Sequence, residues 1–365
     1  MPRQTTPDEL ADTESAWRNA AAACKDALSR TAILFLPSDG EGWVNSAVEV
    51  ATGQTVTLLA SGQVWLSREA NLALGPNVTL WYRIGDGPIA RCVANTGSFI
   101  ADRSGTLWLI TKPPGEWADA AGNFLTDYLH KGATGGLLVA ALVWSGRADA
   151  GLKAFAAHDA SGIAGSELLR RAKERPLPRG WHPLWRVGET RMFWEEAEAD
   201  RGLFIACRCD NDAAILKYPV DVQLNKDTQL AWSWRIERLP SVAAENTPVT
   251  HDYLSVAVEF DNGQDLTYMW SSSLPVGTVF RCPLGWWDKH ETHVVRRSGA
   301  QGLGRWMAEQ QPVLQDYQNA VGGDPPQRIV GVWLIALSAF QRQVAQAGFR
   351  DLQLSGSGRG VWIGP

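Results

Sequence analysis

The feature that most constrains the fold is a series of short apolar or alternating runs, each ended by Gly, Asn, Asp or Pro. Such runs are typical of β-strands separated by turns. Parallel strands would need long crossover connections, usually helices, and the spacing of these runs leaves no room for them. The chain therefore favours antiparallel sheets packed as sandwiches. In the first half the runs are TVTLLASGQVWLS, VTLWYRIG, GTLWLIT and GGLLVAALVWSG.

Three segments break this pattern and predict helices. Residues 7–29 are Ala-rich and acidic in the first turn, with Pro7 at their start. Residues 148–175 have a helical composition, and the proline-containing run PLPRGWHPLW that follows them is typical of a connector between domains. Residues 305–322 carry the helical signal of the second half. The strand-like runs around it are RGLFIACRC, AAILKYPVDV, LAWSWRIERL, YLSVAVEF, LTYMWSS, THVVRRSG, IVGVWLIAL and GFRDLQLSG.

The length of 365 residues is sufficient for two domains that each bury a core. We predict a mainly β fold: two jelly-roll-like antiparallel β-sandwich domains, with an N-terminal helix and a helical linker. The expected boundaries are 1–32 for the N-terminal helical segment, 33–147 for the first sandwich, 148–187 for the linker and 188–357 for the second sandwich.

Charge and cysteine content indicate which partners and which cellular compartment to expect. The net charge is -5 and no basic stripe is present, so we do not expect nucleic acid as a partner. The five cysteines are odd in number and form no CxxC pair, which favours reduced thiols in a cytoplasmic protein. The N-terminus is polar, and the longest apolar stretch, GGLLVAALVW, is too short to span a bilayer. We therefore expect no signal peptide and no membrane contact. The sequence is compatible with a homo-oligomer.

Tryptophan is the outlier of the composition, with 18 residues. In LAWSWRIERLP, Trp232, Trp234 and Ile236 alternate with small or charged residues, so in a strand they share one face. In a sandwich this face points at the opposite sheet, which predicts that both tryptophans belong to the core. The alternative is a concave sheet face on which the two rings stack against a sugar.

Four residues are candidates for proton transfer: His251, Asp252, Tyr268 and His290. His251 and Asp252 stand side by side before YLSVAVEF, and a carboxylate could orient the imidazole as a general base. The alternative for Asp252 is a turn residue that accepts local backbone N–H groups. Tyr268 either packs in the core with one satisfied hydroxyl or faces a ligand. His290 lies in CPLGWWDKHETHVV, beside two tryptophans and an aspartate.

Aromatic and arginine side chains form the second set of candidates. Trp286 and Trp287 lie in a predicted loop, and functional residues concentrate on loops. For Arg305, the alternative is a structural ion pair with Asp316. The candidate ligand-binding residues are Trp270, Trp286, Trp287, Arg305 and Trp306.

We expect neither a metal site nor an organic cofactor. His290 and His293 form an HxxH pair, which a regular strand would split between its two faces, and no third ligand follows at a recognisable spacing. P-loop, Rossmann and nucleophile-elbow signatures are missing from the sequence.

The second half resembles the DUF3047 family, whose function is unknown. The resemblance rests on LAWSWRIERLP, HDYLSVAVEF, LTYMWSSSLPVGT, the run from VVRRSGAQGLGRW to RIVGVWL, and FRDLQL, in that order through roughly residues 200–355. It implies a jelly-roll-like sandwich similar to carbohydrate-binding modules and brings no established activity. Where that family tends to have an Asp-rich stretch after IVGVWLIAL, this chain has SAFQRQVAQAG, which puts an ion or polar-ligand role of that loop in doubt.

The region of about 50–145 resembles the calcium-dependent galactophilic lectins of the PA-IL type. The resemblance rests on TVTLLASGQVWLS, RIGDG, NTGSF and the loop PPGEWADAAGNF. It implies a sandwich fold and a loop that supplies calcium ligands. At the corresponding positions this chain has Lys112, Glu116, Asp119 and Ala120, and a cation in place of a carboxylate opposes calcium binding.

These observations favour a binding protein for a glycan or a related polyhydroxylated compound. The alternative is a cofactor-independent lyase, isomerase or hydrolase that acts on a small apolar or glycosidic substrate, in the second sandwich or between the domains. A structural role is the third possibility.

Overall fold

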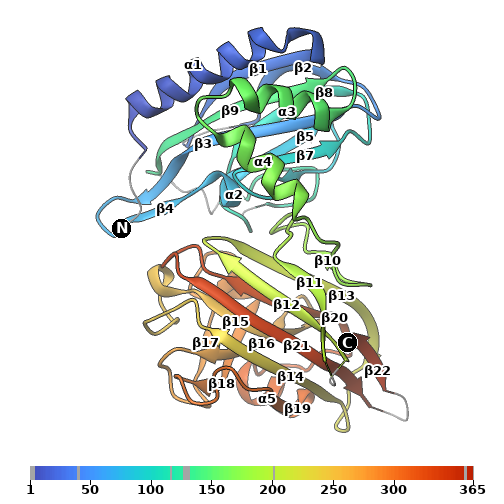
Figure 1. Cartoon of the computed structure of the whole chain (residues 1–365). Coiled ribbons are helices and arrows are strands. Elements are labelled where there is room, and N and C mark those ends of the chain that lie inside the picture. Colours follow the sequence, from blue (N-terminus) through green and yellow to red (C-terminus); the bar gives the residue numbers. More distant parts are fainter. Residues whose placement is uncertain are drawn as a thin grey trace. The chain divides into compact units, whose positions relative to one another are not determined.

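The computed structural model describes residues 5–38, 42–115, 117–125, 132–199, 202–356 and 360–364. The chain forms two compact units, Met1–Glu174 and Arg175–Pro365, here called unit 1 and unit 2 (Figure 1). Both are built mainly from antiparallel sheets, which confirms the predicted mainly β fold. No helix in the described ranges is long and apolar enough to cross a membrane. All five cysteines are buried and none forms a disulfide.

Unit 1 contains two sheets with antiparallel pairing throughout. One has the order β1 (Leu28–Pro37), β9 (Thr134–Trp144), β3 (Thr55–Ser67), β4 (Leu72–Leu74), and β7 (Thr96–Ile100) also pairs with β3. The other has the order β2 (Val44–Val50), β8 (Gly105–Thr111), β5 (Leu80–Ile84), β6 (Ala90–Arg91). Alternating apolar residues of both sheets, such as Leu58, Leu107 and Val139, form a buried core.

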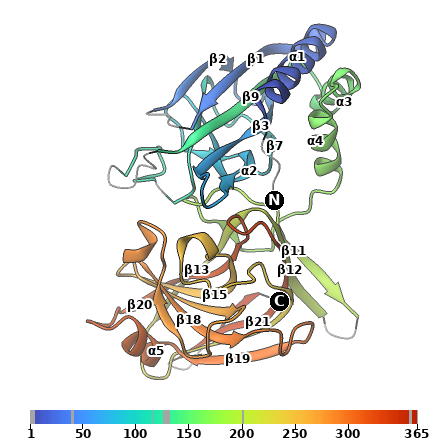
Figure 2. The ribbon, with the colours of Figure 1, turned by 90° about the vertical axis from the view of Figure 1, so that its left-hand side faces the viewer.

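The helical elements of unit 1 are α1 (Pro7–Ala23), η1 (Lys25–Ala27), the short α2 (Pro76–Thr79), α3 (Ala148–His158) and α4 (Ile163–Ala172). Of these, α1, α3 and α4 pack on one side of the sheet that contains β9 (Figure 2). A capping box between Thr6 and Glu9 starts α1. The helix ends earlier than the predicted 7–29, because Leu28 already pairs with Trp144 in the sheet.

Helices α3 and α4 occupy most of the segment that we expected to link the domains, and they pack within unit 1. Glu167 of α4 is fully buried and accepts hydrogen bonds from Thr96 Oγ1 at 2.7 Å and Ser98 Oγ at 2.8 Å. Arg170 pairs with the same carboxylate at 2.7 Å. Burial by itself raises the pKa of Glu167, but the bonds from Arg170, Thr96 and Ser98 outweigh it and hold the pKa below its usual value. This carboxylate therefore clamps α4 to β7.

We predict that acid weakens unit 1 through Glu167. A carboxylate with a lowered pKa in the folded state stabilises the fold above its unfolded pKa, and this contribution is lost as the pH falls through the folded pKa. Glu167→Gln should lower the melting temperature at neutral pH and flatten its fall in acid. Thermal unfolding of both proteins across the acid range measures this; parallel pH profiles would contradict it.

Unit 2 contains a seven-stranded and a six-stranded sheet. The first has the order β10 (His182–Pro183), β13 (Ala213–Gln223), β20 (Arg328–Leu337), β15 (Tyr253–Phe260), β16 (Asp265–Ser271), β18 (Glu291–Ser298), β17 (Val279–Arg281). The second has the order β11 (Phe193–Glu198), β12 (Gly202–Asp210), β21 (Val344–Ser355), β14 (Gln229–Arg238), β19 (Met307–Pro312), and β22 (Val361–Gly364) pairs with β21. The helical elements are α5 (Val313–Ala320), η3 (Pro248–Thr250) and η4 (Trp287–Lys289).

Two details of unit 2 differ from expectation. The pair β16–β18 is parallel, because the chain between them first forms β17 on the far side of β18. The predicted helical segment 305–322 is helical only from Val313; Met307–Pro312 is a strand that pairs with β14. Pro312 explains the switch, since proline breaks a helix interior and is tolerated at its start.

The paired tryptophans of β14 belong to the core of unit 2. Trp232 is 1% exposed and Trp234 is 0% exposed. The Trp232 ring stacks on Tyr268 of the opposite sheet, with ring centroids 5.5 Å apart, and Trp234 lies 5.6 Å from Trp270. The prediction that this face is core is confirmed.

We predict that Trp232→Ala or Trp234→Ala destabilises unit 2 by about 3–5 kcal/mol, the usual cost of removing a buried aromatic ring. Trp362→Ala is the matched control, because that side chain is 56% exposed in the same unit. It should change stability by less than about 0.5 kcal/mol. Chemical denaturation measures all three; equal stabilities would refute the core assignment.

Candidate functional site

The four candidates for proton transfer do not share one pocket. Tyr268 points into the core between the two sheets of unit 2, and Arg296 lies over its ring. His251 contacts Tyr253 and His293, which lie on the outer face of the seven-stranded sheet. His290 is partly exposed, and its Nδ1 lies 2.9 Å from the carbonyl of Gly263.

Asp252 is fully buried, and its carboxylate is hydrogen-bonded to backbone N–H groups. Its carboxylate accepts backbone N–H groups from Phe340 at 3.0 Å and Gln341 at 2.6 Å. We expected local donors, but these follow β20, far along the chain. Burial raises the pKa of Asp252 to about 6, against the opposing effect of the two N–H donors. The residue thus ties the start of β15 to the loop after β20.

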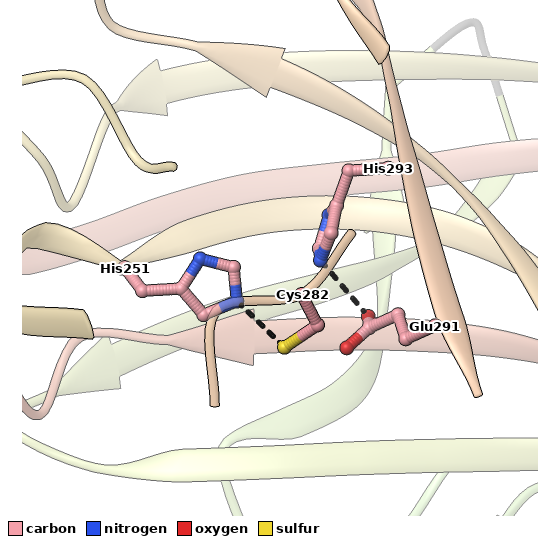
Figure 3. Close-up of side chains that lie close together, drawn as sticks. All are labelled: His251, Cys282, Glu291 and His293. Carbon is pink, nitrogen blue, oxygen red and sulfur yellow. Dashed lines mark hydrogen bonds and ion pairs between the residues drawn. The ribbon is translucent and has the colours of Figure 1, made fainter. Parts of the chain in front are cut away.

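The outer face of the seven-stranded sheet holds a compact cluster of His251, Cys282, Glu291 and His293 (Figure 3). All four side chains are buried, and one ligand atom from each lies within 4.8 Å of the others. His251 Nε2 is 3.3 Å from Cys282 Sγ, and His293 Nε2 is 3.4 Å from Glu291 Oε1. We call these four residues the buried cluster.

Strand alternation and one edge strand bring the cluster together. Glu291 and His293 stand two apart in β18, so they share the outer face. Cys282 follows β17, which pairs with β18, and its N–H donates to the carbonyl of Glu291 at 3.0 Å. His251 comes from the loop between η3 and β15.

A second layer of hydrogen bonds orients the cluster. The Glu245 carbonyl, which can only accept, lies 2.6 Å from His251 Nδ1, so Nδ1 carries the proton and Nε2 faces Cys282 as an acceptor. Tyr253 Oη donates to Glu291 Oε1 at 2.9 Å, and Thr267 Oγ1 lies 3.2 Å from the same oxygen. Neither ring nitrogen of His293 makes a hydrogen bond to any described residue.

Burial sets the protonation states in the cluster. Burial, with a smaller contribution from His293, lowers the pKa of His251 to about 3, so His251 is neutral. Burial raises the pKa of the Cys282 thiol. For Glu291 burial also acts to raise the pKa, but His293 and the hydrogen bonds prevail and bring it to about 2. Two imidazoles, a thiol and an ionised carboxylate are a donor set that could hold a transition metal.

Sequence reasoning considered His251 and His293 separately, missed Cys282 and Glu291, and expected no metal. It paired His293 with His290, whereas the structure places His293 beside His251, Cys282 and Glu291. The available signal was ETH in a strand, which puts Glu291 and His293 on one face. Cys282 and His251 lie in loops, so no periodicity in the sequence connects them.

The candidate ligand-binding residues divide between core and surface. Trp270 is 0% exposed and Trp287 is 7% exposed, so neither presents a ring to a ligand. Trp286 is partly exposed in a left-handed conformation (φ 68°), with Arg186 3.9 Å over its ring and His290 stacked at 4.2 Å. Arg305 is exposed; the expected partner of Arg305, Asp316, instead pairs with Arg296 of β18.

Trp306 forms a platform on the outer face of the six-stranded sheet. Its ring lies against Gly348 of β21, where an added Cβ would meet the ring at 3.0 Å. Arg350 and Arg235 lie 4.1 Å and 4.8 Å from the ring centroid, and Phe204 meets it edge-on at 5.6 Å. Trp306 Nε1 donates to Glu198 Oε2 at 2.9 Å. We call Phe204, Arg235, Arg350, Glu198 and Trp306 the Trp306 platform.

The loop after β8 in unit 1 packs its aromatic rings against the ammonium of Lys112. Lys112 is 2% exposed, and its ammonium lies 4.7 Å from the Phe124 ring and 5.6 Å from the Trp117 ring. Asp119 accepts from the Asn123 side chain at 2.6 Å and from the backbone of its own turn. Ala120 offers only its backbone, and Glu116 lies outside the described residues.

Comparison with known proteins confirms the first resemblance: the family model of DUF3047, a protein family of unknown function, matches residues 179–353. No curated protein matches the chain. Among solved structures, the N-terminal domain of EclA, a PllA-like lectin, is a neighbour with 20% identity and a TM-score of 0.25, over 32% of this chain and 98% of that one.

Two further neighbours are a xyloglucanase domain of NopAA from Sinorhizobium fredii in complex with cellobiose and a family 11 carbohydrate-binding module of Clostridium thermocellum. The first has 9% identity and a TM-score of 0.28, over 45% of this chain and 91% of that one. The second has 10% identity and a TM-score of 0.24, over 49% and 84%. All three neighbours are carbohydrate-binding or glycoside-hydrolase domains, and with scores this low they carry no argument about this chain.

We predict that Asp252→Asn destabilises unit 2 by about 1–3 kcal/mol, since the amide can accept only one of the two buried N–H groups and turns its own donor toward the other. Asp210→Asn is the control, because the Asp210 side chain is 60% exposed. Urea denaturation measures both. An Asp252→Asn protein as stable as the control would show that the carboxylate does not tie this loop down.

Proposed function

We propose that the chain binds a carbohydrate or a related polyhydroxylated ligand, and that the Trp306 platform carries the site. The observation behind this proposal is a partly exposed indole ring that rests on a sheet and is surrounded by arginine and glutamate side chains. Aromatic faces stack on the apolar faces of sugar rings, and charged groups at the ring's edge bond to hydroxyls.

The platform is already held in place without ligand. Glu198 accepts from the Trp306 indole and, at 2.7 Å, from Arg235 Nη1. Arg235 Nε also lies 2.6 Å from Glu237 Oε1. Fixed side chains lose little conformational entropy when a ligand binds, which favours affinity.

The charge of the platform favours a neutral ligand. The two arginines of the sheet are matched by Glu198 and Glu237, which lie within ion-pair distance of Arg235. An acidic polymer would meet these carboxylates, so neutral oligosaccharides fit better than polyuronates.

An enzyme that uses His251, Asp252, Tyr268 and His290 needs an acid and a base around one reacting atom. Asp252 accepts backbone N–H groups and Tyr268 packs in the core, so no observation favours that alternative.

Cytoplasmic location stays a prediction.

We predict that Trp306→Ala weakens binding of neutral oligosaccharides at least about 10-fold, because the stacking surface is removed. Isothermal titration of the full chain with cello-, xylo- and galacto-oligosaccharides measures this, with Trp362→Ala as the exposed-tryptophan control. Polygalacturonate serves as the acidic comparison. Unchanged binding by Trp306→Ala, or no binding of any neutral oligosaccharide by the native chain, would contradict the proposal.

A further inference from the structure

We propose that the buried cluster of His251, Cys282, Glu291 and His293 is a zinc site with four protein ligands. This inference concerns the opposite sheet of unit 2 from the Trp306 platform and does not depend on glycan binding. Its basis is the placement of four ligand atoms in one buried volume, within 4.8 Å of one another (Figure 3).

The spacing of the ligand atoms suits a tetrahedral ion. Zinc bonds of about 2.0–2.1 Å to nitrogen or oxygen and about 2.3 Å to sulfur give tetrahedral edges of about 3.4 Å between N and O and about 3.6 Å between N and S. The structure has 3.4 Å between His293 Nε2 and Glu291 Oε1, and 3.3 Å between His251 Nε2 and Cys282 Sγ. The remaining pairs of ligand atoms lie within 4.8 Å of one another.

The ring nitrogens of His251 and His293 are available to bind a cation. His251 is held by the Glu245 carbonyl in the tautomer that leaves the Nε2 lone pair directed into the cluster. His293 is 0% exposed, and both of its ring nitrogens make no hydrogen bond within the described chain. A buried polar group without a partner costs free energy, and metal coordination would remove that cost for the ligating nitrogen.

Two hydroxyl groups hold the Glu291 carboxylate in place. Tyr253 Oη donates to Glu291 Oε1 at 2.9 Å, and Thr267 Oγ1 lies 3.2 Å from the same oxygen and 3.0 Å from Asp265 Oδ1. Hydrogen bonds to the ligating groups are a regular feature of metal centres, where they fix ligand orientation. A plain Glu291–His293 ion pair would account for one contact but not for the 3.3 Å approach of Cys282 Sγ to His251 Nε2.

Charge and ligand type select the ion. With Glu291 ionised and the Cys282 thiol giving up its proton to solvent as the Zn–S bond forms, two negative ligands balance one divalent cation in a buried volume. Calcium and magnesium require oxygen ligands, whereas zinc accepts sulfur, nitrogen and oxygen in a tetrahedron. Four protein ligands without exposure to solvent make a closed, structural site.

The site would fasten two loops to the sheet. His251 belongs to the loop before β15, and Cys282 to the segment between β17 and η4. Glu291 and His293 are rigid parts of β18. Bound zinc would thus hold the segment that carries Trp286, Trp287 and His290 against the outer face of the seven-stranded sheet.

The test uses the full-length chain. We expect one zinc per chain by elemental analysis after purification in zinc-containing buffer, and a melting temperature that falls with chelator and recovers with Zn²⁺. Co²⁺ added to the metal-free chain should give a thiolate-to-cobalt charge-transfer band with tetrahedral visible bands. No bound metal, copper or iron in preference to zinc, or a cobalt spectrum without a thiolate band would overturn the proposal.

Variants locate the site. Cys282→Ser and His293→Gln should each weaken Zn²⁺ binding at least about 100-fold, and Cys282→Ser should abolish the thiolate band. Cys207→Ser is the matched control, a buried cysteine of β12 in the other sheet, and should bind as the native chain does. Tyr253→Phe keeps all four ligands and should weaken binding about 10- to 100-fold while it retains the band. Native affinity in His293→Gln, or loss of the thiolate band in Cys207→Ser, would place the metal elsewhere.

Discussion

The packing of Trp232 and Trp234 on β14 against Tyr268 and Trp270 on β16 is the contact on which unit 2 depends. These four large rings fill the space between the two sheets and fix which face of each strand is inside. Because side chains alternate along a strand, the same contact decides which residues point outward. Any ligand chemistry in this unit is therefore confined to the outer faces and to the loops that cover them.

The outer faces of the two sheets differ in character. On the six-stranded sheet, Arg235 lies between the buried Trp234 and Ile236, and with Trp306 it forms a partly exposed charged aromatic surface. On the seven-stranded sheet, Glu291 and His293 lie under loops that exclude water. One face thus suits a polar ligand from solution, and the other suits a small cation that becomes part of the fold.

The strand pattern predicted much of this from the sequence alone: the mainly β fold, the helices α1, α3 and α4, and the inward tryptophans of β14. It mistook Met307–Pro312 for helix, because pairing with β14 overrides local helical composition. It missed the buried cluster for a different reason. Cys282 and His251 reach β18 through loops, and the parallel pairing of β16 with β18 has no local signature in the sequence.

X-ray absorption at the zinc edge, on the full-length chain loaded with one equivalent of Zn²⁺, tests the buried cluster most directly. We expect a four-coordinate shell with one sulfur at about 2.3 Å and three nitrogen or oxygen atoms at about 2.0–2.1 Å, with the outer scattering of two imidazoles. A shell without sulfur, or one of six oxygen and nitrogen atoms, would contradict a site made of His251, Cys282, Glu291 and His293.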